Sequence, residues 1–261
     1  MLINAMSIYN GRIRSFSASQ LASIFTDHYA YEVIRLIRGK ALFLELHLDR
    51  LLKSCQALRY PPLNKVKVLE EIDFLVQENH LTNINFKIMV FQDQRILFPI
   101  ESHYPSVDDY LRGVCCSLLF EERENPELKA HQASLRERSN KQIESEEVYE
   151  SVLVNQQGLI TEGSRSNLFF INKDIIFTAE DALVLGGISR AKVLEICELS
   201  GLELIKKAIS TQELSQCQAA FICGTSPGVL PIKKIESHVF DVQNPLLRII
   251  HQKFHKRYLL T

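Results

Sequence analysis

Short apolar runs and helical patterns follow one another along the first hundred residues, which predicts an α+β unit. Asn10-Gly11 is a two-residue hairpin turn between apolar segments, and Arg38-Gly39-Lys40 separates a second pair of short strands. From Leu46 to Leu58, apolar residues recur three or four positions apart, as on one face of a helix, and Pro61-Pro62 ends that helix. The other elements expected in this half are strands at 31–37, 41–44, 84–92 and 95–100 and a helix at 64–77. A sheet with two helices on one side accounts for this pattern.

The rest of the chain is richer in strands. Ser102 to Asp109 contains Pro105 and few apolar residues, so it is the predicted linker between a small α+β domain at 1–106 and a larger domain at 107–261. The elements expected after it are strands at 113–120, 151–155, 159–161, 167–171, 175–178, 203–208 and 219–223 and helices at 130–147, 188–200, 211–217 and 245–257. We therefore predict an α+β fold of two subdomains with a cleft between them.

Composition excludes several classes of protein. The 261 residues carry a formal net charge of −1 without a basic run, so nucleic acid is not an implied partner. No apolar stretch approaches the roughly 20 residues that span a bilayer, so no membrane partner is expected. The N-terminal residues lack the pattern of a signal peptide, and the six cysteines lack the spacing of a metal or redox site. We expect a cytoplasmic protein with reduced thiols and no metal.

Glu162 is the first candidate for chemistry. It ends an apolar strand and is followed directly by the small polar loop Gly163-Ser-Arg-Ser-Asn167. A carboxylate at the end of a rigid strand is well placed to meet a bound ligand. The alternative interpretation is a hairpin whose loop is merely polar.

Two further segments have the features of anion sites. Cys223-Gly-Thr-Ser-Pro-Gly228 follows an apolar strand, where backbone N–H groups and hydroxyls converge. Leu185-Gly-Gly-Ile-Ser-Arg190 opens a helix, whose N-terminus has unpaired N–H donors and the positive end of the helix dipole. The alternatives are an ordinary turn and an ordinary capped helix. Neither segment fits the nucleotide-triphosphate loop pattern.

Two basic residues complete the set of candidates. Arg50 lies three residues after His47 beside an apolar helical stripe, where it either extends to solvent or reaches a buried anion. Lys129 follows a polar loop and precedes a helix. A desolvated lysine has a lowered pKa, and its neutral amine can form a Schiff base, although one lysine among many is weak support.

Taken together, these segments resemble the class IV, fold-type IV pyridoxal-phosphate enzymes. This family includes branched-chain and D-amino-acid aminotransferases and 4-amino-4-deoxychorismate lyase. The segments that carry the resemblance, in matching order, are Tyr31-Glu-Val-Ile-Arg35, His47-Leu-Asp-Arg-Leu51, Lys129, Ile160 to Phe170, Gly187-Ile-Ser-Arg190 and Gly224-Thr-Ser226. The 33 residues from Lys129 to Glu162 also match the family's spacing. The resemblance implies a small α+β N-terminal domain, a larger C-terminal domain around a β pseudo-barrel, a cofactor between them, and a homodimer.

The resemblance also implies a role for each candidate residue. Lys129 is then the Schiff-base lysine that moves the substrate's α-proton, and Glu162 is the partner of the pyridine nitrogen of pyridoxal 5'-phosphate. Asn167 holds the loop behind the cofactor ring. The residues implied for the phosphate cradle are Arg50, Ile188, Ser189, Thr225 and Ser226. On the substrate side the candidates are Tyr31, Arg165 and His103; exposure to solvent is the alternative for Arg165, and packing of the linker is the alternative for His103.

The implied activity is amino-group transfer from an amino acid or amino-carboxylate, through the Lys129 Schiff base, to a 2-oxo acid. The alternative is 4-amino-4-deoxychorismate lyase, which releases pyruvate and 4-aminobenzoate for folate biosynthesis; a minor alternative is a pyridoxal-phosphate-binding protein without turnover. The loop after Glu162 lacks the Glu-Gly-Ala-Gly-Glu-Asn form of branched-chain enzymes, which favours the compact D-amino-acid and lyase subgroups. No motif singles out a chorismate-like ring.

Overall fold

Two compact units make up the chain. The computed structural model describes residues 6–16, 20 and 29–259. Among these, the residues up to His103 together with Leu128–Ala133 form the first unit, and Tyr104–Glu127 together with the residues from Ser134 onward form the second unit. The predicted domain division after residue 106 stays a prediction. The compact units differ from it chiefly at residues 128–133, which contain Lys129 and pack with the first unit.

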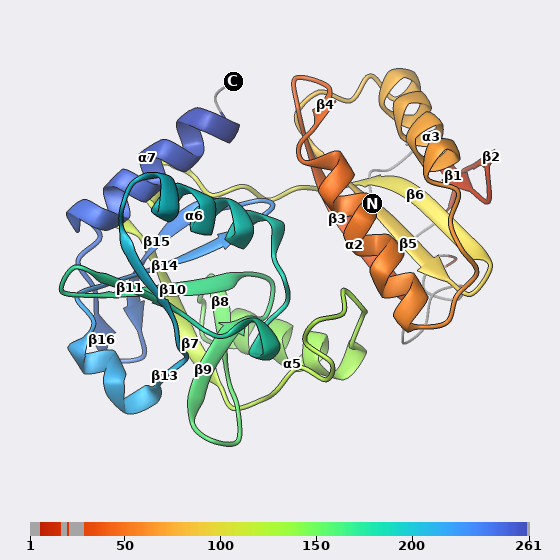
Figure 1. Ribbon diagram of the computed structural model, residues 1–261. Coiled ribbons are helices and arrows are strands. Elements are labelled where there is room, and N and C mark those ends of the chain that lie inside the picture. The colour runs from red at the N-terminus through yellow and green to blue at the C-terminus, as the bar shows by residue number, and fades with distance from the viewer. Residues whose placement is uncertain (1–5, 17–19, 21–28, 260–261) are drawn as a thin grey trace. The chain divides into compact units, whose positions relative to one another are not determined.

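The first unit is an antiparallel sheet with helices on one face. Its strands, in the spatial order β2-β1-β6-β5-β3-β4, are β1 (Ser7–Tyr9), β2 (Arg12–Arg14), β3 (Ala30–Ile37), β4 (Lys40–Ala41), β5 (Asn85–Phe91) and β6 (Gln94–Ile100). Its helices are α2 (Leu44–Ala57) and α3 (Lys65–Glu78), which lie along the same face of the sheet (Figure 1). The strand expected at 41–44 is shorter than predicted, because Phe43 has a left-handed φ of 55° and is the N-cap residue of α2, which begins at Leu44.

Strand β3 has two different faces, because side chains of a strand alternate. Ala30, Ile34 and Leu36 are buried in the core that α2 and α3 cover. Tyr31 points to the opposite face, where it packs with other apolar residues of the sheet. Glu32 lies on the same side as Ala30 and Ile34, so its carboxylate faces the apolar helix-covered side and needs a partner there.

The second unit is built around a closed ring of strands. Its strands are β7 (Val114–Leu119), β8 (Glu150–Val154), β9 (Leu159–Gly163), β10 (Asn167–Asn172), β11 (Ile175–Thr178), β12 (Glu203–Lys206), β13 (Ile209–Ser210), β14 (Ala219–Gly224), β15 (Gly228–Ile235) and β16 (His238–Val239). Six of them pair in the order β10-β14-β15-β7-β8-β9, and β9 pairs with β10 again through Glu162 and Asn167. The ring therefore closes at the pair of residues that the sequence singled out.

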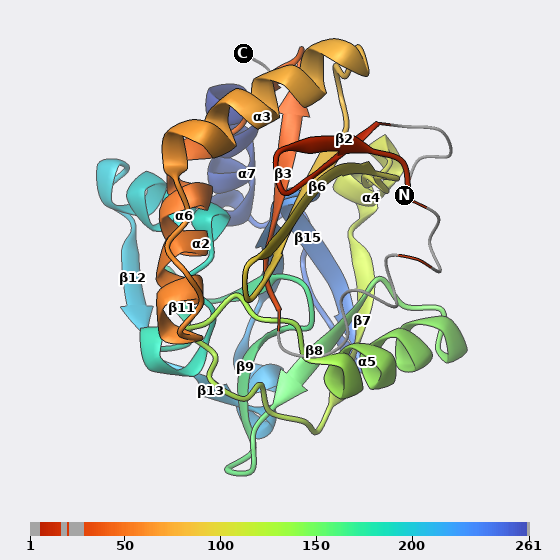
Figure 2. The same ribbon diagram turned by 90° about the vertical axis from the view of Figure 1, so that its right-hand side faces the viewer.

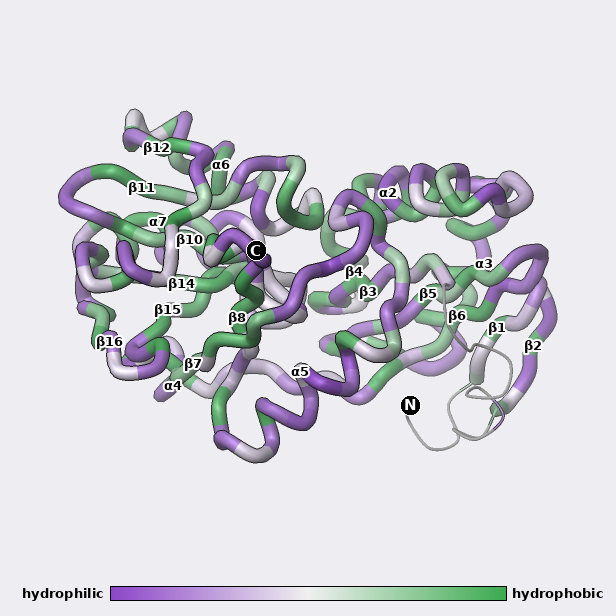
Figure 3. Tube along the Cα trace, turned by 90° about the horizontal axis from the view of Figure 1, so that it is seen from below, coloured by the Kyte–Doolittle hydropathy of each residue, from purple (hydrophilic) through white to green (hydrophobic). Residues whose placement is uncertain are grey.

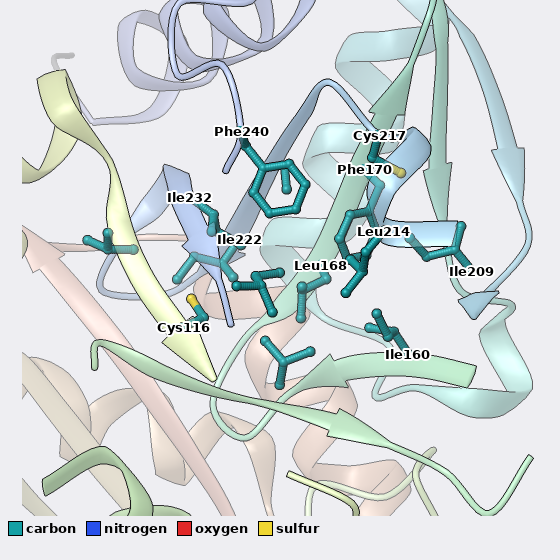
Figure 4. Close-up of a cluster of buried hydrophobic side chains, with 14 of the residues drawn as sticks. Cys116, Ile160, Leu168, Phe170, Ile209, Leu214, Cys217, Ile222, Ile232 and Phe240 are labelled. Carbon is teal, nitrogen blue, oxygen red and sulfur yellow. The ribbon is translucent and has the colours of Figure 1, made fainter. Parts of the chain in front are cut away.

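Apolar side chains fill the inside of this ring. Val152, Ile160, Leu168, Ile222 and their neighbours from the other strands form one buried cluster (Figure 4). A ring of this size leaves room only for side chains, so its interior is a packed core and the ligand chemistry must lie outside it. The strands of the ring are more hydrophobic than the helix that runs outside it. Figure 3 shows hydrophobic colour on β14, β15 and β8 and mostly hydrophilic colour on α5 (Ala133–Ser145).

An irregularity in β9 decides which way Glu162 points. Val154 pairs with Ile160 and Val152 pairs with Gly163, so three steps along β9 match two steps along β8. Such a bulge reverses the alternation of side chains. Without it, Glu162 would lie on the inward side with Ile160. With it, Glu162 pairs with Asn167 on the outward side of β10, which is the side opposite the buried Leu168 and Phe170.

Helices cover the outside of the ring. They are α4 (Val107–Arg112), α5, α6 (Ile188–Leu199) and α7 (Pro245–Tyr258), with short 3-10 turns at Asp181–Leu183 and Thr211–Gln216. The α6 helix packs on β14, α7 packs on β14, β15 and α6, and α5 runs beside β8 (Figure 2). Among the described residues, none of the helices combines the length and the apolar character that a bilayer crossing requires.

Two predicted boundaries in this part of the chain need correction. The segment predicted as a linker contains the start of α4, where Ser106 and Asp109 form a reciprocal capping box. The helix expected from residue 130 begins at Ala133, because Ala130 forms an antiparallel bridge with Ala30 and the residues on either side of it hydrogen-bond to Tyr31 and Tyr29.

The turn between β9 and β10 is held by a buried glutamate. Glu150, at the start of β8, is 2 % exposed and accepts four hydrogen bonds. Its Oε1 accepts from the Ser164 hydroxyl at 2.6 Å and from the Ser151 N–H at 3.1 Å. Its Oε2 accepts from the Ser166 hydroxyl at 2.8 Å and from the Arg165 N–H at 3.2 Å. Three consecutive residues of the turn are thereby tied to one carboxylate.

We predict that Glu150→Gln destabilises the protein by about 1–3 kcal/mol. Each oxygen of Glu150 accepts from one backbone N–H, so the NH₂ group of glutamine would face a donor in either orientation of the amide. Urea unfolding followed by circular dichroism measures this loss. Glu144→Gln, at an exposed position of α5, is the matched control and should unfold like the wild type. Equal midpoints for Glu150→Gln and the wild type would contradict the role assigned to this carboxylate.

Candidate active site

Lys129 is held against the edge of β3 in the first unit. The Tyr31 N–H donates to the Lys129 carbonyl at 3.0 Å, and the His131 N–H donates to the Tyr29 carbonyl at 2.8 Å. On the other side, the Lys129 N–H donates to the buried Ser54 hydroxyl of α2 at 3.2 Å. The backbone of Lys129 is therefore bonded through both of its polar groups, although it lies outside regular secondary structure.

The amine of Lys129 lies over an aromatic ring. Its Nζ is 4.9 Å from the centre of the Tyr31 ring, and the Nζ of Lys87 is also 4.9 Å from the centre of that ring. Tyr31 is buried, with 8 % of its surface exposed. The negative face of the ring attracts ammonium groups within about 6 Å. Tyr31, predicted on the substrate side, is thus a direct neighbour of Lys129, and Lys87 is a neighbour that the sequence did not indicate.

Glu32, His47 and Arg50 form a buried charged cluster in the same unit. The Arg50 Nε donates to Glu32 Oε1 at 2.6 Å, and its Nη2 donates to Oε2 at 2.8 Å. The Nδ1 of His47 lies 2.7 Å from Glu32 Oε2, so it carries the proton and donates to the carboxylate. Arg50 is 14 % exposed in its side chain and Glu32 is 0 % exposed. Arg50 therefore does not extend into solvent, and its planar fork is oriented by a buried carboxylate.

The charges in this cluster set its protonation. Burial alone would raise the pKa of Glu32, but the charge of Arg50 and the hydrogen bonds from Arg50 and His47 lower it from 4.5 to about 2. Burial lowers the pKa of His47 below its ordinary value; Glu32 opposes this effect, and the charges of Arg50 and Lys129 add to it. At neutral pH the cluster holds one carboxylate, one guanidinium and a neutral imidazole.

Glu162 lies on the outer side of the ring in the second unit and is 2 % exposed. The Arg123 Nε donates to its Oε1 at 2.6 Å. Its Oε2 accepts from the Leu185 N–H at 3.1 Å and, more weakly, from the Asn167 Nδ2 at 3.4 Å. An ionised carboxylate has about four acceptor positions, so these three contacts leave room for a further donor.

Asn167 links Glu162 to the start of α6. Its Nδ2 also donates to the Leu185 carbonyl at 3.0 Å. A Cβ added at Gly187 would lie 1.9 Å from the Asn167 Oδ1, so only glycine fits at this helix N-cap. Asn167 is thus bonded to the segment before α6. Its role in holding the loop behind a cofactor ring stays a prediction.

Both expected anion sites have suitable local structure. Gly187 caps α6 without a side-chain hydrogen bond to the helix, so the N–H groups of Ile188 and Ser189 open the helix. Thr225 and Ser226 are half-buried in the turn between β14 and β15, which Gly224 and Gly228 close as a pair. Hydroxyls and backbone N–H groups at a helix N-terminus and a strand turn are the usual ligands of phosphate.

The remaining predicted residues have less informative surroundings. Arg165 is exposed, and its guanidinium donates to the Asn140 side chain of α5. His103 is exposed at the end of the first unit, after β6. Their roles toward a substrate stay predictions. Within the described part of the chain, no group of three or more His, Cys, Asp or Glu side chains is placed to hold a metal ion.

Besides Lys87, three contributors to these clusters were missed from the sequence: Glu32, Arg123 and Glu150. A signal existed for Glu32, since a charged residue on the apolar side of a strand must find a buried partner. Glu150 lies at the start of a strand whose five residues are all buried, which is a weaker form of the same signal. Arg123 stands in a polar stretch between two elements, and nothing in its neighbourhood distinguishes it.

We predict that Glu32→Gln lowers the stability of the protein by about 3 kcal/mol near neutral pH, because it leaves the Arg50 charge buried without its partner. A carboxyl with a depressed pKa stabilises the fold above its unfolded pKa of 4.5, and this contribution is lost as pH falls toward about 2. The difference between wild type and variant should therefore be smaller at about pH 3.5 than at about pH 5, as measured by urea unfolding. A difference that stays constant over this range would contradict the assigned charges.

Known proteins share both sequence and fold with this chain. The D-alanine aminotransferase of Bacillus licheniformis is 35 % identical over 98 residues, which are 37 % of this chain and 34 % of that protein. For the first curated relatives, the chain spans less than half of the relative's own length.

Solved structures show the same fold over nearly the whole chain. The branched-chain amino acid aminotransferase of Escherichia coli has a TM-score of 0.85 at 18 % identity, covering 97 % of this chain and 94 % of that one. A putative 4-amino-4-deoxychorismate lyase from Legionella pneumophila has a TM-score of 0.77 at 18 % identity, covering 93 % and 95 %. A hypothetical aminotransferase from Mycobacterium tuberculosis in a PLP-bound form has a TM-score of 0.82 at 14 % identity, covering 98 % and 99 %.

The sequence model of the class IV amino-transferase family matches residues 29–235. These residues include all strands of the ring, the segment that opens α6 and the turn that follows β14. The two-unit α+β fold and the resemblance in sequence are thereby confirmed. The chain belongs to the class IV aminotransferase family.

Proposed function

We propose that this chain is a pyridoxal-phosphate-dependent enzyme that transfers an amino group from an amino acid to a 2-oxo acid. The observation that carries the proposal is the placement of Glu162. Its buried carboxylate points outward from a rigid ring and lies within hydrogen-bond distance of the segment that leads into α6. Family membership and the aminotransferase names of its relatives support the same activity.

The donors and acceptors in the chain fit this cofactor. A pyridine nitrogen that carries a proton needs an acceptor, and Glu162 has acceptor capacity beyond its three contacts. A phosphate needs N–H and hydroxyl donors, which Ile188, Ser189, Thr225 and Ser226 supply in the second unit. An aldehyde needs an amine, for which Lys129 is proposed. Arg50, in the first unit, is proposed as the charged ligand of the phosphate, with its orientation set by Glu32.

Bound pyridoxal phosphate supplies an electron sink that stabilises negative charge on the substrate's α-carbon. The residues of this chain then have separate tasks. Glu162 holds the proton on the ring nitrogen, because a carboxylate beside that nitrogen favours its charged form. Lys129 removes the α-proton and returns a proton during transfer. The hydrogen bonds of its backbone to Tyr31 and Ser54 fix the position of its Cα. Tyr31, Arg165 and His103 are proposed on the substrate side.

A second candidate activity is the lyase reaction on 4-amino-4-deoxychorismate, which releases pyruvate and 4-aminobenzoate. The similarity in fold to the putative lyase from Legionella pneumophila favours keeping it. The same Lys129 and Glu162 serve both reactions, so residues that contact the substrate decide between them. We propose that the protein is a cytoplasmic homodimer. As a transferase it would act in amino-acid metabolism, and as a lyase it would act in folate biosynthesis.

The binding of the cofactor is tested by absorption spectroscopy. The purified protein with added pyridoxal phosphate should absorb near the edge of the visible range, because the cofactor is joined to the Lys129 amine. Lys129→Ala should lose this band, whereas Lys141→Ala, at an exposed position of α5, should keep it. A wild type that stays colourless, or a Lys129→Ala variant with the full band, would overturn the proposal.

The task of Glu162 predicts a separation of binding from chemistry. Glu162→Gln should keep the cofactor bound but slow exchange of the substrate's α-proton by about 100-fold or more, since an amide does not keep the ring nitrogen protonated. Exchange of the α-proton of D- and L-alanine into heavy water, followed by NMR, measures the rate. An unchanged rate in this variant would remove Glu162 from the mechanism.

The two candidate reactions differ in what they consume. With D- or L-amino acids and 2-oxoglutarate, a transferase forms glutamate and a new 2-oxo acid. With 4-amino-4-deoxychorismate alone, a lyase releases pyruvate without any amino acceptor. We expect glutamate formation, and pyruvate release without an acceptor would favour the lyase instead.

A further inference from the structure

The turn at Thr225–Pro227 is held from outside the ring by two helices. It connects β14 to β15 and is closed by the pairing of Gly224 with Gly228. Gly228 has a φ of +61°, and a Cβ there would lie 2.8 Å from the Leu259 Cδ1 and 3.1 Å from the His255 Nε2. The end of α7 therefore lies directly against the backbone that ends this turn.

Two side chains bond to the backbone on either side of Gly228. The Tyr110 hydroxyl of α4 donates to the Pro227 carbonyl at 2.8 Å. The His255 Nε2 of α7 lies 3.2 Å from the Val229 carbonyl; since a carbonyl only accepts, this nitrogen carries the proton and donates. The rings of Tyr110 and His255 also contact each other edge to face, with their centres 4.9 Å apart. Together they form a clamp on the carbonyls of residues 227 and 229.

The clamp is itself supported. The Arg248 Nη1 donates to the Tyr110 carbonyl at 2.9 Å, and its Nη2 donates to the Leu111 carbonyl at 3.1 Å, which ties the end of α4 to α7. The ring of His251 packs against that of His255 with their centres 4.2 Å apart. Arg248 thus fixes the backbone of Tyr110. The ring of Tyr110 packs against the rings of His251 and His255. Such support is what a side chain needs to hold a backbone segment within a fraction of an ångström.

We propose that Tyr110 and His255 are positioning residues for the phosphate-binding turn. The inference rests on the proposed function, in which Thr225 and Ser226 donate to the cofactor phosphate. Neither side chain of the clamp needs to touch the phosphate. Both fix the carbonyls that follow Thr225 and Ser226, and so they keep the donors of this short turn in one arrangement before the cofactor binds.

The proposal predicts a loss of affinity that is specific for the phosphate. Tyr110→Phe keeps the ring and its packing but removes the hydrogen bond to Pro227. Its Kd for pyridoxal phosphate should rise about 2- to 10-fold over that of the wild type. Its Kd for pyridoxal, which lacks the phosphate, should stay unchanged. Both values are measured by equilibrium dialysis at a temperature at which wild type and variant are fully folded by circular dichroism.

Two further variants control for indirect effects. Tyr149→Phe removes the hydroxyl of another half-buried tyrosine that packs on the same core, and it should leave the Kd for pyridoxal phosphate unchanged. His255→Leu should raise that Kd in the same way as Tyr110→Phe, while His255→Gln, which keeps an N–H donor, should restore part of the affinity.

The outcomes separate this inference from the function on which it rests. A wild type that binds no pyridoxal phosphate overturns both. If the wild type binds the cofactor and Tyr110→Phe binds it equally well, the proposed function stands and the positioning role is wrong. An equal loss for pyridoxal and pyridoxal phosphate also overturns the role, because the clamp would then support the fold and not the phosphate turn.

Discussion

The pairing of β9 with β10 at Glu162 and Asn167 is the constraint on which the second unit depends. It closes the ring of six strands, so the interior becomes one apolar core without a sheet edge. The bulge in β9 makes the closure compatible with a carboxylate at this place, because it turns Glu162 away from the core. One irregularity of backbone pairing thus serves both the closure of the ring and the presentation of the charge.

Three of the buried carboxylates are stabilised in different ways. Glu32 is paired with a guanidinium and a neutral imidazole, which lower its pKa to about 2 against the effect of burial. Glu150 is held by hydroxyls and backbone N–H groups of the turn that closes the ring. Glu162 combines an ion pair to Arg123 with a backbone N–H. Only Glu162 has its remaining acceptor capacity at the segment that opens α6, which explains why it and not the others is the candidate for contact with a ligand.

Each unit holds its candidate residues through backbone contacts with distant parts of the chain. Residues 129–131 add to the edge of β3, so Lys129 packs with the first unit although the residues on both sides of 128–133 belong to the second. In the second unit, Gly187 lets Asn167 approach the start of α6, and Tyr110 and His255 bond to the turn after β14. These hydrogen bonds restrict the backbone of loop segments that lie outside the regular elements.

The sequence by itself determined the elements, the α+β class and the family, because periodicity, turn residues and short motifs are local properties of the chain. Glu162 and the two candidate anion sites were singled out from their neighbours along the chain, whereas Lys129, weakly supported by itself, and Asn167 became candidates through the family resemblance; the roles of all of them stay predictions. Only the tertiary structure decided that Arg50 pairs with Glu32, that Arg123 pairs with Glu162, and that Lys129 packs with the first unit. The partners in these contacts lie 18 to 75 residues apart, so no local pattern encodes them. The outward direction of Glu162 has the same origin, since strict alternation from Ile160 predicts the inward side and only the pairing of three strands places the bulge that reverses it.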